Sequence, residues 1–386
     1  MFGRKKMCAA VAVTAALLLT GCAGGSGGLA SPSAASPTAH ALPAAQASAL
    51  QKVLDDAHGT LVFPGAIARV ITPKGEWTGA VGTTAAGGRT TPTAADHTRI
   101  GSLTKTMTAT ILLQLVSEGK VSLDDPLSKY VPGLPNGDAT LRQVADMTSG
   151  IPSYTLDAQI TDRYLASPEE PWTPAQLLDG VKTLTPTFAP GQGWQYSNSN
   201  YVALGEVIEK VTGQPIAQVF QQRIFGPLGM TQSSFPSTTD LPEPYISGVT
   251  LQGVDGTIPR DAAHFSPTFA GTAGQVVSTL DDMTKWAHAL FTGDKVLTPQ
   301  MQQLRRDSIL TSPPPNTATA GYGIGIGDRN GWWGHDGDIP GYTTSVYHDY
   351  GSDVTIVVLV GSDIDAPSGQ APAPYIFAGL VKALGQ

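Results

Sequence analysis

Apolar residues recur with a helical period in several separate segments of the 386-residue chain. The clearest case begins after Gly101, where Met107, Ile111 and Leu115 share one side of a helix that we expect to end near Gly119. The other expected helices cover residues 46–57, 141–147, 200–212, 215–225 and 372–384, together with one that starts at Ser278 or Thr279 and ends near Leu290. Further helix starts are expected at Thr173-Pro174 and Thr298-Pro299.

Stretches with strand character, bounded by glycine and proline turn signals, lie toward both ends of the chain. Helical segments occupy the middle. The pattern therefore predicts one α+β domain, in which terminal strands pair and a helical insert lies between them. The expected strands cover residues 64–72, 76–81, 322–327, 331–334, 342–347 and 354–360.

Residues 1–21 have the pattern of an export signal. Basic residues at 4–6 precede an apolar run over 8–20 that is too short to span a bilayer comfortably. The run ends in Leu19-Thr20-Gly21-Cys22, which resembles the bacterial lipobox, whose cysteine is lipidated. We therefore predict a lipoprotein signal peptide over 1–21 and an extracytoplasmic protein anchored to the cell membrane through Cys22. An ordinary signal peptide with a chance cysteine is the alternative.

Residues 22–45 are rich in Gly, Ala, Ser and Pro, which is typical of a flexible tether. The single domain is then expected over residues 46–386. Its composition suits a globular core, since the chain is 41% hydrophobic and 14% charged. No cysteine follows Cys22, so this domain has no internal disulfide.

The charge pattern and the missing motifs exclude several classes of function. The net charge is −8 and no Lys/Arg run follows residue 6, which disfavours nucleic-acid binding. We expect no metal and no cofactor, because metal-ligand spacings, a Walker loop and a dinucleotide fingerprint are all missing. The Gly-x-Ser-x-Gly match at 24–28 lies in the tether and is rejected. The expected partner is a small-molecule or peptide substrate of a monomeric protein.

Ser102 and Lys105 are the first candidates for chemistry. They are three residues apart at the start of the helix that follows Gly101, so both lie on one face. A lysine whose pKa is lowered by burial can accept the proton of a serine hydroxyl. Ser-x-x-Lys also occurs by chance, and the second copy at Ser117–Lys120 crosses a helix end. The pair therefore needs support from other motifs.

Two further motifs supply that support, namely Tyr196-Ser197-Asn198 and His335-Asp336-Gly337. With Ser102-Leu103-Thr104-Lys105, in this order and context, they resemble the serine β-lactamase and D-alanyl-D-alanine peptidase superfamily. The most similar branch is that of the class C β-lactamases and secreted DD-carboxypeptidases. The resemblance extends from about residue 48 to the C-terminus and implies an antiparallel sheet flanked by helices with a mostly helical insert.

The resemblance also implies roles for the site residues. Ser102 attacks a carbonyl and forms an acyl-enzyme, Lys105 helps to deprotonate it, and Tyr196 relays a proton with its pKa lowered by nearby cations. Asn198 bonds to Lys105 or to a substrate amide, although on local spacing alone it could be a simple N-cap. His335 completes the catalytic set. The backbone N–H groups of Ser102 and Asp338 form the oxyanion hole.

The third motif departs from the Lys-Thr-Gly or His-Thr-Gly of many members. Its middle residue is Asp336, next to Gly337 at the expected substrate-binding edge, and an aspartate there would repel a substrate carboxylate. The preceding segment offers no cation before Arg329, which could compensate if it folds back to the cleft. This departure argues against efficient β-lactamase action.

The main hypothesis is thus an anchored serine hydrolase acting by acyl transfer, either a DD-carboxypeptidase-like peptidase on cell-wall peptides or an esterase or amidase on small substrates. A weak β-lactamase or penicillin-binding protein is one alternative. The other is a non-catalytic cell-envelope binding protein that kept the fold. The presence of Ser102, Lys105 and Tyr196 together argues against this last hypothesis.

Overall fold

The computed structural model describes residues 40–386. The predicted signal peptide, Cys22 and most of the predicted tether lie outside these described residues. The first helix begins at Ala44, two residues earlier than the expected domain start. Within residues 40–386, no helix combines the length and apolar character needed to cross a membrane.

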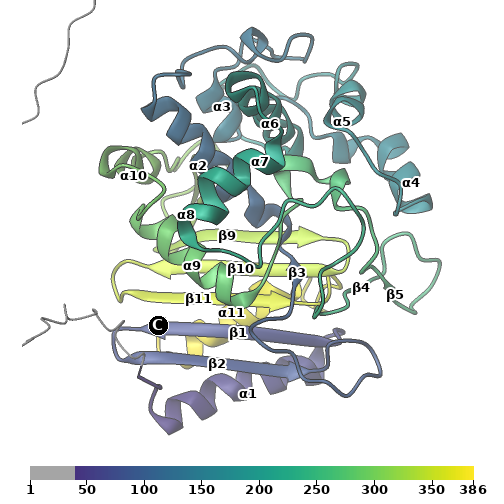
Figure 1. Ribbon diagram of the computed structural model, residues 1–386, viewed down its shortest axis with the longest axis vertical. Helices are drawn as coiled ribbons and strands as arrows, with labels where there is room; N and C mark the ends of the chain where they lie inside the picture. Colours follow the sequence, from purple (N-terminus) through teal and green to yellow (C-terminus); the bar gives the residue numbers. More distant parts are fainter. Residues whose placement is uncertain (1–39) are drawn as a thin grey trace, which may run out of the picture. The chain divides into compact units, whose positions relative to one another are not determined.

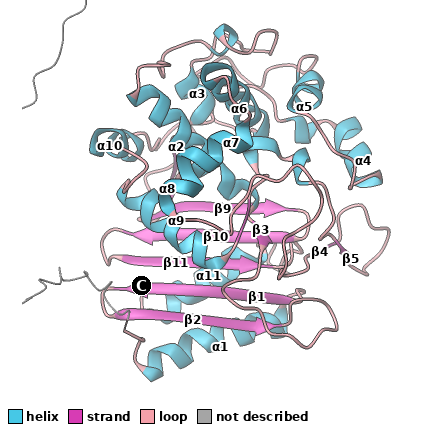
Figure 2. Ribbon diagram, viewed as in Figure 1, coloured by secondary structure: helices cyan, strands magenta, loops and turns pink. Residues whose placement is uncertain are grey.

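A seven-stranded antiparallel sheet forms the framework, and strands from both ends of the described chain meet in its middle (Figures 1 and 2). This confirms the predicted fold class, with terminal strands paired and helices between them. In sheet order the strands are β2 (Gly75–Gly82), β1 (Gly65–Thr72), β11 (Val354–Val360), β10 (Tyr342–Asp349), β9 (Trp332–Ile339), β8 (Gly327–Arg329) and β7 (Ala320–Tyr322).

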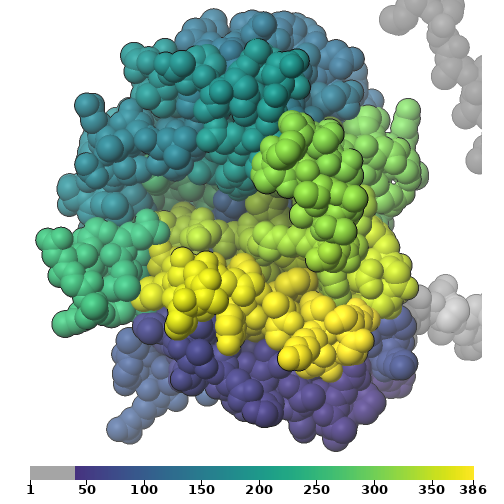
Figure 3. Space-filling model, turned by 180° about the vertical axis from the view of Figure 1, so that it is seen from behind, coloured from purple at the N-terminus to yellow at the C-terminus, as the bar shows by residue number. Residues whose placement is uncertain are grey.

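Both faces of the sheet are covered, because its central strands alternate between two apolar clusters. On β11, Ile356 and Val358 pack with the first and last helices, whereas Val357 and Leu359 pack with the central helices. In the view from behind, the C-terminal part of the chain (yellow) lies next to the first part of the described chain (purple) (Figure 3). The helices are α1 (Ala44–Thr60), α2 (Thr104–Ser117), α3 (Leu141–Ala145), α4 (Ala158–Ala166), α5 (Pro174–Val181), α6 (Asn198–Thr212), α7 (Ile216–Phe220), α8 (Gly226–Leu228), α9 (Leu280–Thr292), α10 (Pro299–Asp307) and α11 (Pro372–Ala383).

Local capping signals explain why several helices begin where the sequence predicted. Thr140 caps α3 and Thr173 caps α5, each in a capping box with the glutamine three residues later. Thr279 caps α9, which carries Asp281 and Asp282 in its first turn. These side chains satisfy backbone N–H groups that the helix itself leaves free.

Three predictions for the chain were wrong or incomplete. The expected strand over 322–327 is two short strands, β7 and β8, joined by a turn in which Gly325 has a φ of +67°. Strand β9 extends five residues beyond the predicted end at 334 and carries the whole third motif. The expected helix 215–225 is split into α7, a π-helical turn over Gln221–Phe225 and α8. Helix α4 was not predicted.

Smaller strand pairs connect the segments around the site. Strand β3 (Thr98–Arg99), just before the first motif, pairs with β6 (Val277–Ser278), just before α9. Strand β4 (Val249–Thr250) pairs with β5 (Arg260–Asp261) in the long stretch between α8 and α9. The first of these pairs fixes the approach to Ser102.

Candidate active site

Ser102 lies in a single 3₁₀ turn, Gly101–Leu103, that leads directly into α2. Gly101 has a φ of +53°, and a Cβ placed on it would lie 2.7 Å from the backbone nitrogen of Asp338. This position therefore requires glycine on two grounds, its backbone conformation and the close approach of β9. The result is a partly exposed serine at the junction of helix and sheet.

Lys105 lies one turn further along α2 and is fully buried. Its Nζ is 2.9 Å from Ser102 Oγ, 2.7 Å from Asn198 Oδ1 and 2.8 Å from the carbonyl oxygen of Ala273. Burial holds the pKa of Lys105 well below its usual value, which favours the neutral amine. In the neutral form, the amine would give its two N–H groups to the two carbonyl acceptors, and its lone pair would be left for the Ser102 hydroxyl.

The second motif lies at the start of α6. Ser197 is the N-cap residue and makes no side-chain cap, so Asn198 is the first helical residue and its side chain turns to Lys105 instead. The simple N-cap interpretation of Asn198 is thereby excluded. A hydrogen bond from the Asn198 backbone to Ser153 Oγ, 3.1 Å long, holds this helix start in place.

The predicted pKa shift of Tyr196 was in the wrong direction. The Lys105 ammonium position lies 4.7 Å from the centre of the Tyr196 ring. Burial nevertheless raises the pKa of this phenol, the charges of Asp338 and Asp336 raise it further, and only the Ser102 hydroxyl opposes them. Because its own burial outweighs the other influences on the phenol, Tyr196 stays protonated and is suited to donating a proton.

The third motif occupies the free edge of β9, beyond its short pairing with β8. A Cβ on Gly337 would collide with the carbonyl oxygen of Ile100 and the hydroxyl of Thr344. Thr344 also donates a hydrogen bond of 2.9 Å to the same carbonyl. These contacts hold β9 against the segment before Ser102, so that the backbone nitrogen of Asp338 lies beside Gly101.

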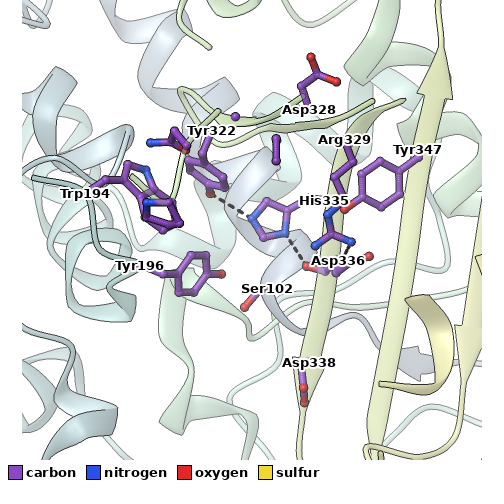
Figure 4. A pocket seen from close by; sticks show the side chains of 16 residues that line it. Ser102, Trp194, Tyr196, Tyr322, Asp328, Arg329, His335, Asp336, Asp338 and Tyr347 are labelled. Atoms are coloured by element: carbon purple, nitrogen blue, oxygen red, sulfur yellow. Dashed lines mark hydrogen bonds and ion pairs between the residues drawn. The ribbon is translucent and has the colours of Figure 1, made fainter. Parts of the chain in front are cut away.

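His335 is buried and faces Tyr322 (Figure 4). Its Nδ1 points to the backbone carbonyl of Asp336, which only accepts hydrogen bonds, so Nδ1 carries the proton. Its Nε2 then accepts from the Tyr322 hydroxyl at 3.0 Å. Burial is the main cause that lowers the pKa of His335 to about 3. The neutral imidazole therefore makes two hydrogen bonds, to Tyr322 and to the backbone of Asp336. It holds these groups in position and does not exchange protons near pH 7.

Asp336 lines the same cleft as His335, but its charge does not stand alone. Arg329 Nη1 lies 2.6 Å from Asp336 Oδ2, and Ser345 donates a hydrogen bond of 2.6 Å to Oδ1. Arg329 thus folds back to the cleft, as the sequence allowed. It forms an ion pair with Asp336 there, so the two side chains together add no net charge to the cleft. From the sequence, we expected Asp336 to repel a substrate carboxylate by its charge. The structure corrects this expectation, because Arg329 neutralises the charge.

Two cavities meet at Ser102 and Asp338. The larger, of about 400 Å³, contains Tyr196, Trp194, His335 and the Arg329–Asp336 pair (Figure 4). The smaller, of about 280 Å³, is lined by Asn198, Asp338 and an aromatic group, Tyr154, Tyr164 and Phe269. When a substrate carbonyl lies at Ser102, the part of the substrate on one side of it can occupy the larger cavity, and the part on the other side can occupy the smaller one.

Several residues of the site were not predicted from the sequence. Trp194 and Tyr322 form walls of the larger cavity, and Ala273 offers the carbonyl that holds Lys105. Trp194 could have been found from its place two residues before the second motif. The other two carry no local signal, because the fold brings them to the site from distant parts of the chain.

The comparisons with known proteins agree with this geometry. The Beta-lactamase family matches residues 50–380. PbpX of Bacillus subtilis (strain 168), named for penicillin binding, is 30% identical over 69% of this chain, which spans 61% of that relative's length.

Two crystal structures are similar over most of the fold. A D-stereospecific amidohydrolase from Streptomyces sp. has a TM-score of 0.76 and 30% identity, covering 87% of this chain and 97% of that protein. The D-amino acid amidase from Ochrobactrum anthropi SV3, complexed with L-phenylalanine amide, has a TM-score of 0.77 and 26% identity over 89% and 99%. With the family matched over residues 50–380, the chain belongs to the Beta-lactamase family.

Proposed function

We propose that this protein is a serine hydrolase that cleaves amides and esters whose leaving group carries no carboxylate. The observation that carries the proposal is the ion pair between Arg329 and Asp336, 2.6 Å long, in the cavity that contains Tyr196. Penicillins and peptides ending in D-alanine place a carboxylate in the leaving part of the substrate. The cation that could receive this carboxylate is already paired.

The proposed reaction begins at Ser102. Its Oγ forms a bond to the substrate carbonyl carbon while its proton passes to the neutral amine of Lys105, 2.9 Å away. The carbonyl oxygen becomes negative between the N–H groups of residues 102 and 338. Asn198 and the carbonyl of Ala273 hold the resulting ammonium.

Tyr196 then completes the first half of the reaction. Its phenol donates a proton to the leaving nitrogen or oxygen as the bond to the carbonyl carbon breaks, and it recovers a proton from Lys105. Water attacks the acyl-enzyme along the reverse path, giving the acid and free Ser102. The raised pKa of Tyr196 fits this order, because the group starts protonated.

The names of the similar proteins support an amide substrate. One is called a D-stereospecific amidohydrolase and the other a D-amino acid amidase. The leaving group of a simple amide is ammonia or an amine, and that of a small ester is an alcohol. None of these needs a cation in the larger cavity. DD-carboxypeptidase and β-lactamase activities are therefore expected to be weaker.

The test compares p-nitrophenyl acetate and D-phenylalanine amide with nitrocefin and a D-alanyl-D-alanine peptide on the purified protein. We expect the first pair to give the higher kcat/KM. A fluorophosphonate probe should label Ser102, with Ser102→Ala as the unlabelled control. Faster turnover of nitrocefin or the peptide would refute the substrate proposal, and no label at all would favour the non-catalytic binding protein.

We also propose that the protein is extracytoplasmic and anchored to the membrane by a lipid on Cys22. The support is the basic start, the short apolar run and the Leu19–Cys22 segment of the sequence. Cys22→Ser should move the protein from the membrane fraction to the medium or stall its processing. A variant that stays membrane-bound at its mature size contradicts the proposal.

A further inference from the structure

Asp338 differs from the other acidic residues around the cleft because nothing in the described residues pairs with its carboxylate. Asp336 has Arg329, and Asp363 accepts hydrogen bonds from Thr250 and Gln252. Asp338 has neither an ion pair nor a side-chain hydrogen bond within residues 40–386. Its side chain is exposed and borders both cavities at Ser102.

The position of Asp338 relative to the reaction is fixed by its own backbone. Its backbone nitrogen lies beside Gly101, where an added Cβ would come within 2.7 Å of it, and the proposed oxyanion hole uses this N–H together with that of Ser102. The carboxylate is only three bonds from that nitrogen. A charged group on the carbon next to the substrate carbonyl therefore comes within reach of it.

The direction of the substrate follows from the catalytic groups. Tyr196, which donates to the leaving group, lines the larger cavity but not the smaller one. The acyl part must then occupy the smaller cavity, which Asn198 and Asp338 border. Its aromatic wall includes Tyr164 and Phe269, stacked with ring centres 3.9 Å apart. This wall suits an apolar side chain on the acyl residue.

We propose that the carboxylate of Asp338 binds a free α-ammonium group on the acyl part of the substrate. The preferred substrates are then amides or esters of amino acids with an unblocked amine and an apolar side chain. This inference rests on the proposed function and names the substrate class of the same site. Asp338 is a specificity residue through its side chain and an oxyanion donor through its backbone.

The charge environment supports this assignment. A carboxylate left without a cation in a protein cleft is destabilised until a positive group arrives. Burial by the surrounding protein raises the pKa of Asp338 to about 7, with Asp363, Asp365 and Asp336 adding to the shift in that order. The side chain itself still reaches solvent. A substrate ammonium would supply the missing partner, and the acidic neighbours would add a weaker attraction.

The experiment uses two substrates that differ only in the amine, phenylalanine p-nitroanilide and 3-phenylpropionyl p-nitroanilide, with the amino acid in the enantiomer that the parent turns over. The measured quantity is the ratio of their kcat/KM values. Asp338→Asn keeps the backbone donor and the size of the side chain, and should lower this ratio about tenfold, mainly through KM. Asp338→Glu should recover part of it.

Asp365→Asn is the matched control. It removes the same charge from a neighbouring position that lines neither cavity. The ratio should change less than twofold. Equal effects of the two asparagine variants would mean that the overall negative charge of the region, and not Asp338 itself, attracts the amine, and would overturn the proposal. An unchanged ratio in Asp338→Asn would also overturn it.

The outcomes also separate this inference from the proposed function. Fluorophosphonate labelling of Ser102 in Asp338→Asn verifies that the variant is folded. If the parent prefers carboxylate-bearing leaving groups, the proposed function fails. If the parent prefers neutral leaving groups but ignores the amine, only the role of Asp338 fails.

Discussion

The two cavities beside Ser102 differ in whether the charged side chains on their walls are paired. In the larger one, Asp336 and Arg329 neutralise each other, and the Asp336 side chain retains 19% exposure. Asp338, which borders the smaller cavity and also reaches the larger one at Ser102, has no partner within the described chain. A charge that the protein has already paired selects weakly, whereas an unpaired charge awaits an opposite one on the substrate.

The largest expected effect removes the chemistry that the two cavities share. Ser102→Ala should lower kcat/KM by roughly 10⁴-fold or more, because the attacking oxygen is gone. The loss should be equal for amine-bearing and amine-free substrates, since Ser102 lies where the two cavities meet and Asp338 is unchanged. Steady-state kinetics on the two p-nitroanilides measures it. Residual activity within about tenfold of the parent would contradict the assignment of the nucleophile.

A second variant tests whether close packing of Gly325 against α2 keeps Lys105 in position. A Cβ on Gly325 would collide with Ala109 and lie 3.0 Å from the carbonyl oxygen of Lys105. Gly325→Ala should therefore displace Lys105 and lower kcat/KM by about 100-fold for both kinds of substrate.

Gly119→Ala is the control for this variant. Gly119 has the same φ of +67°, but a Cβ placed on it would have no neighbouring atom within 4 Å. It should show only the backbone strain, a loss of about 1 kcal/mol in the free energy of unfolding, with activity retained. Equal activity losses in the two variants would show that strain, and not the contact with α2, is responsible.

The third variant acts on the larger cavity alone. Asp336→Thr frees Arg329 and should raise kcat/KM for nitrocefin about fivefold, with little change for a p-nitrophenyl ester. The gain should shrink at high salt, because Arg329 is half exposed. Equal changes for both substrates would mean that this pair does not select charge, and the DD-carboxypeptidase hypothesis would regain support.

The smallest expected effect is the pH dependence of the smaller cavity. Because the pKa of Asp338 is raised to about 7, its negative charge is present above that pH and lost below it. The preference for a permanently cationic N-trimethyl substrate over the 3-phenylpropionyl one should rise about threefold from pH 6 to pH 8. The same ratio in Asp338→Asn should stay flat. The other titratable groups near Asp338 are Asp336, Asp363, Asp365, Lys105, Tyr196, Tyr154 and Tyr164.

The sequence predicted those features that depend on neighbouring residues. The first-motif helix follows from its apolar period, and the starts of α3, α5 and α9 follow from Thr140, Thr173 and Thr279. The motif residues were found because their spacing in the chain resembles a family. Local patterns of this kind need no knowledge of the tertiary fold.

The missed features depend on contacts between distant segments. The glycine alternation over 323–327 looked like a strand, but Gly325 lies in a turn pressed against Lys105. The pKa of Tyr196 was expected to fall because the burial of both Tyr196 and Lys105 could not be seen in the sequence. The pairing of Arg329 with Asp336 depends on the turn between β8 and β9.

The most direct test of the account compares two dipeptides that differ only in the leaving group, D-phenylalanyl-D-alaninamide and D-phenylalanyl-D-alanine. Both offer the same acyl residue with its free amine to the smaller cavity, and only the second places a carboxylate in the larger one. We predict that kcat/KM is at least about tenfold higher for the amide. Equal values, or faster cleavage of the free acid, would contradict the claim that the Arg329–Asp336 pair closes this site to carboxylates.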